Sequence, residues 1–256
     1  MLTGNTRGFT LVEILVTSAV SMILLGSIYM AVNSAQRHSM GIERKVAAQQ
    51  DVRPSLELMA MEIRMASFNP NFTTGNWVTP TGSGACTNAS PNQGFRGIQE
   101  ATDTSITVEM DTNQNCTSNN TPSCMTTGAN PNEIIRYNYD MANQRITRET
   151  NCGGAQPFLG DTVASGNPRT VLVVNDIDSD GVWEPTTDIP LFRYYDGSGV
   201  LIATIGTPPS IPAASVPNIR RIEITLAVQT EDVDPNTKQR RSLIYSTSVI
   251  PRNHAN

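Results

Sequence analysis

Residues 7–32 read RGFTLVEILVTSAVSMILLGSIYMAV, and this stretch determines how the rest of the chain is interpreted. The part from Phe9 to Val32 is 24 residues long and mostly apolar, with Glu13 as its single acidic residue. As an α-helix it would be about 36 Å long, enough to cross a hydrocarbon core of about 30 Å. Because a helix satisfies its own backbone hydrogen bonds in lipid, the sequence predicts a membrane-spanning helix.

Two ordinary explanations fit this segment less well. A secretory signal peptide has a shorter apolar stretch that ends in a small-residue cleavage site, and no clear site of that kind follows Val32. A plain membrane anchor leaves Glu13 unexplained, because a carboxylate inside an apolar span is costly unless it is paired. We therefore expect Glu13 to have a partner.

The residues around Glu13 form a recognisable processing site. Arg7-Gly-Phe-Thr-Leu-Val-Glu13 resembles the cleavage motif of type IV prepilins and type II secretion pseudopilins. The resemblance implies that a prepilin peptidase removes the leader after Gly8 and N-methylates Phe9. It also implies that Glu13 faces the N-terminal ammonium of a neighbouring subunit in a filament. Such pairing would offset most of the cost of burying either charge alone.

The resemblance also implies the organisation and the location of the chain. The three expected parts are a leader at residues 1–8, a transmembrane and filament-core helix at residues 9–53, and a globular head at residues 54–256. Basic residues follow the apolar span at Arg37, Arg44 and Lys45, which by the positive-inside rule favours a cytoplasmic C-terminus. Large domains cross regardless of that bias, so the motif decides the orientation. We expect an inner-membrane protein with a periplasmic head, which later enters a pilus at the cell surface.

The helix is predicted to continue into the head. Apolar residues spaced four, three, four and three apart form a stripe suited to packing on a sheet: Val52, Leu56, Met59, Ile63 and Ala66. Pro54 removes a backbone donor and predicts a kink or break near residues 50–53.

Behind the helix the sequence predicts an antiparallel sheet. Residues 69–131 are rich in Asn, Thr, Ser, Gly and Pro, which indicates long surface loops with short strands. One segment with a strand pattern lies within this region, at residues 105–111. Further segments of this kind follow it, at residues 133–139, 144–149, 171–174, 189–195, 221–229 and 242–249. The predicted fold class is α+β, with one long N-terminal helix packed on an antiparallel head, as in pilins.

Composition excludes several functional classes. The chain has 256 residues and a formal charge of −5, whereas nucleic-acid binders usually carry a basic face. Only His38 and His254 are available for histidine chemistry, and no nucleophile–base set or phosphate-binding glycine loop is evident. We expect a non-enzymatic protein.

Looser patterns favour one branch of the superfamily. The segment Glu62–Phe68, the large head and the ending Pro251–Asn253 resemble PilW-type minor pilins. This resemblance implies a structural role in pilus initiation or at the tip, with partners among other minor pilins, the major pilin, the prepilin peptidase and the inner-membrane assembly machinery. A J-type pseudopilin of type II secretion and a tip adhesin remain the alternatives.

The four cysteines lie in the expected head, at Cys86, Cys116, Cys124 and Cys152. An even number of cysteines in an oxidising compartment predicts two disulfides, for which three connectivities exist. We favour Cys116–Cys124 across a short loop and Cys86–Cys152 across the longer one; free buried thiols are the alternative.

Residues 175–188 read NDIDSDGVWEPTTD and match the first half of a calcium-binding loop. The candidate ligands are Asp176, Asp178, Asp180, the Val182 carbonyl, Glu184 and Asp188. The second half departs from the usual pattern, since the expected position of the last ligand holds Thr187. Three neighbouring carboxylates repel one another unless a cation neutralises them, so we expect Ca²⁺ as a cofactor; a solvated acidic turn is the alternative.

Overall fold

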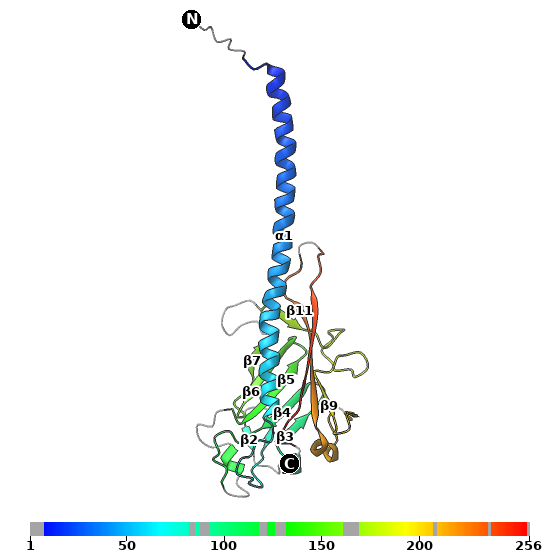
Figure 1. The fold of residues 1–256 in the computed structure, drawn as a ribbon. Coiled ribbons are helices and arrows are strands. Elements are labelled where there is room, and N and C mark those ends of the chain that lie inside the picture. The colour runs from blue at the N-terminus through cyan, green and yellow to red at the C-terminus, as the bar shows by residue number, and fades with distance from the viewer. Residues whose placement is uncertain are drawn as a thin grey trace.

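A long helix, α1, extends from the head and dominates the shape of the molecule (Figure 1). In this computed structural model α1 runs from Leu11 to Arg64 and contains 54 residues. The structure describes residues 8–81, 85–87, 93–117, 122–125, 132–160, 169–206, 209–234 and 237–254, with backbone alone at residues 79–81, 85–87, 93, 122 and 123.

The C-terminal part of α1 packs on the head through the predicted stripe. Val52, Met59 and Ile63 are fully buried in the main core, and Leu56 is nearly so. The helix is capped at its C-terminal end by Met65, whose backbone N–H donates to the carbonyls of residues 62 and 63. The stripe therefore decides which face of α1 turns toward the sheets.

The predicted break at Pro54 is wrong, because α1 continues through this residue for a further ten residues. A proline in a helix interior lacks the donor for the carbonyl four residues earlier. Val52 and Leu56 are buried on either side of Pro54. The burial of these side chains offsets the missing hydrogen bond and keeps the helix continuous.

Two antiparallel sheets form the head. The first has the order β3-β4-β5-β6-β7. Its strands are β3 (Ile98–Ala101), β4 (Ser105–Glu109), β5 (Ile134–Asp140), β6 (Arg145–Thr150) and β7 (Gln156–Leu159). The second has the order β10-β9-β11-β12, with β8 also paired to β11. Its strands are β8 (Val171–Val173), β9 (Phe192–Tyr195), β10 (Leu201–Ile202), β11 (Arg221–Thr230) and β12 (Ser242–Val249).

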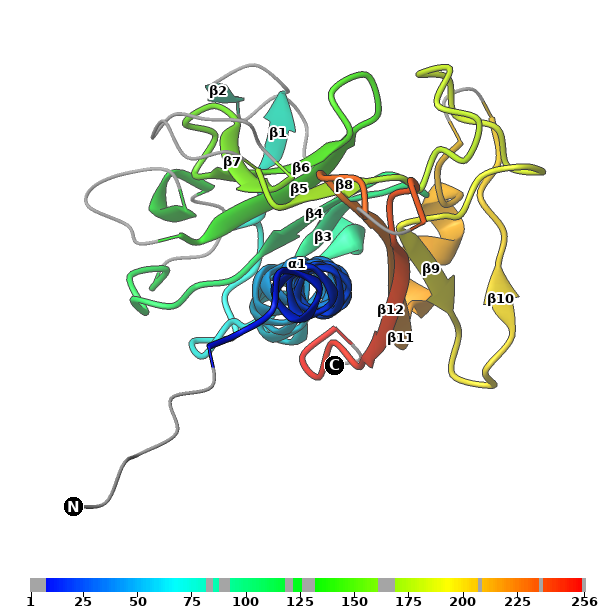
Figure 2. The same ribbon diagram turned by 90° about the horizontal axis from the view of Figure 1, so that it is seen from above.

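Short elements complete the described part of the head. They are the pair β1 (Thr79–Thr81) and β2 (Ala85–Thr87) and the 3₁₀ turns η1 (Gln93–Phe95), η2 (Pro122–Met125) and η3 (Ala213–Asn218). Seen along its axis in Figure 2, α1 lies beside both the β3–β7 sheet and the β11–β12 pair. Both sheets and the helix thus share one core, and the predicted α+β, pilin-like fold is confirmed.

A partly buried ion pair links the helix to the first sheet. Glu62 of α1 accepts hydrogen bonds from Arg148 on β6, including one of 3.1 Å from Nε, and from the Tyr137 hydroxyl on β5. Burial first, and then the charge of Glu62, raises the pKa of Tyr137, so its hydroxyl stays a donor. The pair fixes how α1 is rotated against β5 and β6.

The region predicted as long surface loops is partly buried. Trp77, Val78 and Met125 join three cysteines and Ile134 in a second, smaller core. Glu109 and Asp111 are also fully buried. Composition indicated loops correctly in places, but it could not show that these loops close over a core of their own.

Candidate assembly site and metal loop

The predicted processing residues lie at the exposed start of the chain. Gly8, Phe9 and Thr10 precede the first turn of α1, and Phe9 is 82% exposed. Apart from its two chain neighbours, a Cβ added at Gly8 would meet no atom of the described residues within 4 Å. Packing therefore does not require glycine at position 8, in contrast to Gly97, where an added Cβ would lie 2.3 Å from the Ser67 backbone nitrogen.

Glu13 has a partner within its own chain. Its Oε2 accepts hydrogen bonds of 3.2 Å from the backbone N–H and the hydroxyl of Thr10, and its own N–H donates to the Thr10 hydroxyl oxygen at 3.2 Å. This is a capping box, which satisfies free donors in the first turn of a helix. An acidic side chain is also favourable there because it faces the positive end of the helix dipole.

The capping box changes how Glu13 is interpreted. Part of the reason for an acid at this position is local, since capping lowers the cost of placing it beside an apolar span. A glutamine could make the same hydrogen bonds without the charge. The charge of Glu13, as opposed to its shape, is what a neighbouring ammonium would recognise.

The apolar half of α1 has no partner among the described residues. It is apolar and long enough to cross a membrane, and its most apolar stretch of 18 residues contains no buried residue. The large side chains along it are about half to four-fifths exposed, from Phe9 to Val32. An exposed apolar surface of this size is typical of a site that contacts a membrane or another protein.

An N-terminal processing motif, an exposed apolar helix and an α+β head are together consistent with a membrane-anchored, pilin-like class of protein. Residues 4–29 match the family model described as the prokaryotic N-terminal methylation motif. This match supports placing the chain in the type IV pilin-like superfamily, as a pilin or a pseudopilin. No curated protein and no solved structure matches the chain.

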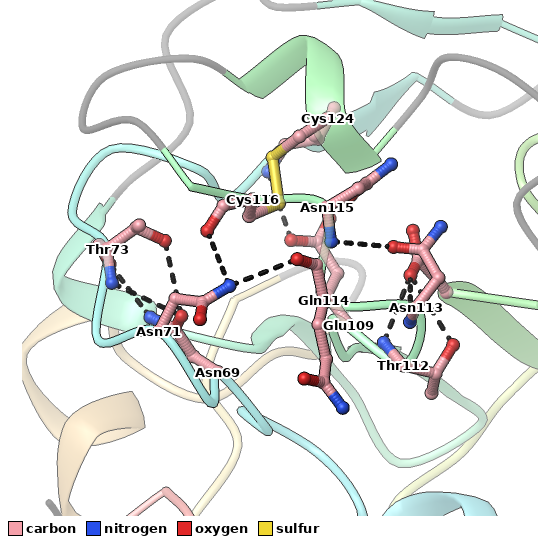
Figure 3. The surroundings of a disulfide bond; sticks show 12 residues. Asn69, Asn71, Thr73, Glu109, Thr112, Asn113, Gln114, Asn115, Cys116 and Cys124 are labelled. Atoms are coloured by element: carbon pink, nitrogen blue, oxygen red, sulfur yellow. Dashed lines mark hydrogen bonds between the residues drawn. A yellow bond between two sulfur atoms is a disulfide. The ribbon is translucent and has the colours of Figure 1, made fainter.

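The disulfide Cys116–Cys124 is confirmed and closes a loop with a sequence separation of 8. Figure 3 shows the amide of Asn71 reaching this loop, where it donates to the carbonyls of Gln114 and Cys116 at 3.1 Å. Cys152 is also disulfide-bonded. The side chain of Cys86 lies outside the described residues, so the pairing Cys86–Cys152 stays a prediction.

Three acidic side chains of the predicted calcium loop come together. Asp176, Asp178 and Asp188 each place a carboxylate oxygen within 4.8 Å of the others. Ca²⁺–oxygen distances are about 2.3–2.6 Å, so oxygens this close fit around one ion. Two of the predicted ligands, Asp180 and Glu184, are not in this group. Asp180 accepts a hydrogen bond of 2.7 Å from the backbone N–H of Val182. Glu184 accepts one of 2.8 Å from the hydroxyl of Thr187.

Backbone donors hold the acidic cluster in place. Asp176 accepts from the N–H groups of Ser179 at 2.8 Å and Gly181 at 2.9 Å, and Asp188 accepts from those of residues 177 and 184. A hydrogen bond to Asp176, followed by smaller effects that include the charges of Asp180 and Asp176, raises the pKa of Asp178. Crowded negative charge on hard oxygen donors is the chemistry that suits calcium.

Two residues that sequence reasoning did not select position this loop. Tyr139 of β5 donates its hydroxyl to the Val173 carbonyl at 3.0 Å and accepts from the Asp176 N–H at 3.1 Å. Asn175 donates to the carbonyls of Ile189 at 3.0 Å and Thr225 at 2.8 Å. Nothing in the local pattern could have identified them, because their partners are distant in sequence.

Proposed function

We propose that the chain is a minor pilin of the PilW type, a non-catalytic subunit that helps to initiate or cap a type IV pilus. The observation that carries the proposal is the methylation motif placed directly before a helix whose apolar surface has no partner among the described residues. A head with two sheets is bulky for a uniformly packed shaft, which favours a place at the tip.

In this proposal cleavage after Gly8 creates the assembly site. Removal of the leader frees an ammonium group at Phe9, and the Glu13 carboxylate of an adjacent subunit neutralises it. The capping box holds the Glu13 carboxylate at the helix start before assembly. Two opposite charges brought together in lipid stabilise the assembled state over the separate chains. The apolar faces of α1 and its neighbours then pack in the filament core.

The proposed partners and location follow from the same site. The prepilin peptidase acts on the leader, the inner-membrane machinery extracts the helix, and other minor pilins and the major pilin pack against it. The head would be periplasmic before assembly and on the cell surface afterwards. A type II secretion pseudopilin would use the same N-terminus, and neighbouring genes for secretin-linked secretion would favour it.

The test separates the charge of Glu13 from its capping role. Glu13→Gln keeps the capping hydrogen bonds and removes the charge, whereas Glu13→Ala removes both. In the host of origin with the gene deleted and the variant supplied, we expect both variants to lose their leader. We also expect both to fall at least tenfold in sheared surface filaments, measured by immunoblotting.

Thr10→Ser is the matched control, because serine retains the capping box and should assemble like the wild type. Wild-type incorporation of Glu13→Gln would refute the ammonium pairing and leave only the capping role. A chain that keeps Met1 in native material, seen by mass spectrometry, would refute the proposed function as a whole.

A further inference from the structure

The turn between β11 and β12 packs against α1 close to the end of the apolar span. Asp232 forms an ion pair with Arg44, with 3.3 Å between Oδ2 and Nε, and the Val233 carbonyl accepts from the same arginine. The carboxylate of Asp234 lies against Gly41, 3.3 Å from where a Cβ would be. Figure 1 shows this turn pointing along α1 toward its N-terminal part.

The position of the contact fixes its distance from the proposed membrane. The apolar span of α1 ends at Val32, Arg37 follows five residues later, and Gly41 follows nine residues later. At a rise of about 1.5 Å per residue, Arg37 lies about 7 Å and Gly41 about 14 Å beyond the end of that span. The polar head groups occupy roughly the first 5–8 Å outside the hydrocarbon core. When α1 spans the membrane, Arg37 therefore lies at the level of the lipid head groups, and the turn lies just outside them, within the roughly 10 Å over which charges attract at 0.1 M salt.

Among the described residues of this turn, the exposed charges that have no ion-pair partner are positive. Lys238 and Arg240 are exposed and form no ion pair with any described residue. The acidic residues beside them are already neutralised, since Asp232 pairs with Arg44 and Asp234 with Arg241. Arg37 is exposed one helical turn before Gly41, on the same face of α1. We call Arg37, Lys238 and Arg240 the basic tip.

We propose that the basic tip binds the anionic phospholipid head groups of the leaflet on the head side and holds the head against the membrane before assembly. The inference rests on the proposed function, because it requires α1 to span the membrane. The chain carries a net charge of −5, so a positive site at the membrane-facing end is opposite in sign to the molecule as a whole. Val233, 45% exposed beside it, adds an apolar contact suited to the interface.

Docking of this kind has a clear physical signature. Basic side chains near an anionic surface gain attraction that falls away within about 10 Å at 0.1 M salt. Each lysine or arginine changes binding about fivefold at moderate salt. The contact should thus depend on the charge of the lipid, on ionic strength and on the two residues of the turn.

The experiment uses the full chain in nanodiscs, with hydrogen exchange of the peptide covering residues 230–241 as the readout. In discs in which one third of the lipid is phosphatidylglycerol, we expect this peptide to exchange about fivefold more slowly than in discs of pure phosphatidylcholine. Salt at 0.5 M should remove the difference. Lys238→Gln with Arg240→Gln should abolish it. The matched control is Arg193→Gln with Arg252→Gln, which makes the same charge change at exposed positions outside the turn.

The outcomes separate the two proposals. Failure of the chain to enter nanodiscs, or rapid exchange throughout residues 14–36 within them, would contradict the membrane-spanning role of α1. If the amides of α1 were protected but the turn exchanged equally fast in both lipids, the docking proposal would be overturned. The membrane-spanning role of α1 would then stand. Loss of the difference in the control pair would also overturn the docking proposal, because the effect would then follow net charge and not the basic tip.

Discussion

Glu109 shows how the head tolerates a buried acid. Its side chain on β4 is fully buried, and one oxygen accepts from the Val78 N–H at 3.0 Å. The other oxygen has no hydrogen-bond partner among the described groups. Burial raises the pKa of Glu109 well above its ordinary value of 4.5, more than the hydrogen bond from Val78 lowers it. The charged form therefore costs stability in the folded state.

Replacing Glu109 by glutamine should stabilise the protein at pH 7. The folded chain binds the proton of Glu109 more tightly than the unfolded chain, so the ionised carboxylate weakens the fold above its raised pKa. Glu109→Gln should raise the free energy of unfolding by on the order of 1 kcal/mol at pH 7. The gain should shrink as pH falls through the raised pKa and vanish below 4.5. Urea unfolding of the full chain in detergent at several pH values measures this.

Glu100→Gln is the control variant, because we expect it to change the free energy of unfolding in the opposite direction. Burial by itself would raise the pKa of Glu100, but the hydrogen bonds and charge of Arg136 outweigh burial and lower it. Its contribution is present above pH 4.5 and is lost as pH falls through the lowered pKa. Glu100→Gln should therefore destabilise the chain at pH 7. If Glu109→Gln and Glu100→Gln changed the free energy of unfolding in the same direction at every pH, burial of Glu109 would not be the cause of its effect on stability.

At the scale of elements, Pro54 offers a test of how packing overrides local preference. The proline leaves the Gln50 carbonyl without its usual helical donor, yet α1 continues to Arg64. Pro54→Ala should raise the free energy of unfolding by about 1–2 kcal/mol, because the restored hydrogen bond exceeds the entropy that proline removes from the unfolded chain. Thermal unfolding of the full chain in detergent measures the change.

Arg53→Ala is the matched control, since Arg53 is exposed one position earlier and should change stability by less than about 0.5 kcal/mol. A Pro54→Ala chain that is less stable than the wild type would mean that proline shapes a bend on which the contact with the head depends.

Elements were predictable from sequence where their signal is local. The helix stripe and the pairs β5–β6 and β11–β12 follow from periodicity and turn residues, and their registers are those of simple antiparallel hairpins. β3 and β7 were not predicted: both are 4 residues long and both have a register shift against their neighbour. A short, irregular strand is specified by the strand beside it more than by its own pattern.

The same division holds for the candidate sites. The processing motif and Cys116–Cys124 are close in sequence and were predicted. Asp176, Asp178 and Asp188 were among the predicted ligands, but the sequence could not show that these three gather while Asp180 and Glu184 stay outside the group. That selection depends on the path of the folded loop, which brings residue 188 back beside residue 176.

At the scale of the whole molecule, the acidic loop connects the two sheets. Tyr139 belongs to β5 of the first sheet, and its hydroxyl contacts the Asp176 backbone. Asn175 accepts from the Ala227 N–H of β11 at 3.0 Å, in the second sheet. A cation held by Asp176, Asp178 and Asp188 would bind a segment anchored on both sheets. Its binding energy would therefore add to the stability of the entire head.

Calcium should accordingly raise the unfolding temperature of the full chain by about 3–6 °C at ten times its dissociation constant, and excess EGTA should reverse the shift. Asp178→Asn should abolish the response, and in calcium-free buffer it should not destabilise the chain, because it relieves repulsion from Asp176 and Asp180. Asp180→Asn should retain the response, since Asp180 lies outside the cluster. A response lost in both Asp178→Asn and Asp180→Asn would favour the linear D-x-D-x-D pattern as the ligand set. An unfolding temperature indifferent to millimolar calcium would leave the loop as a solvated acidic turn.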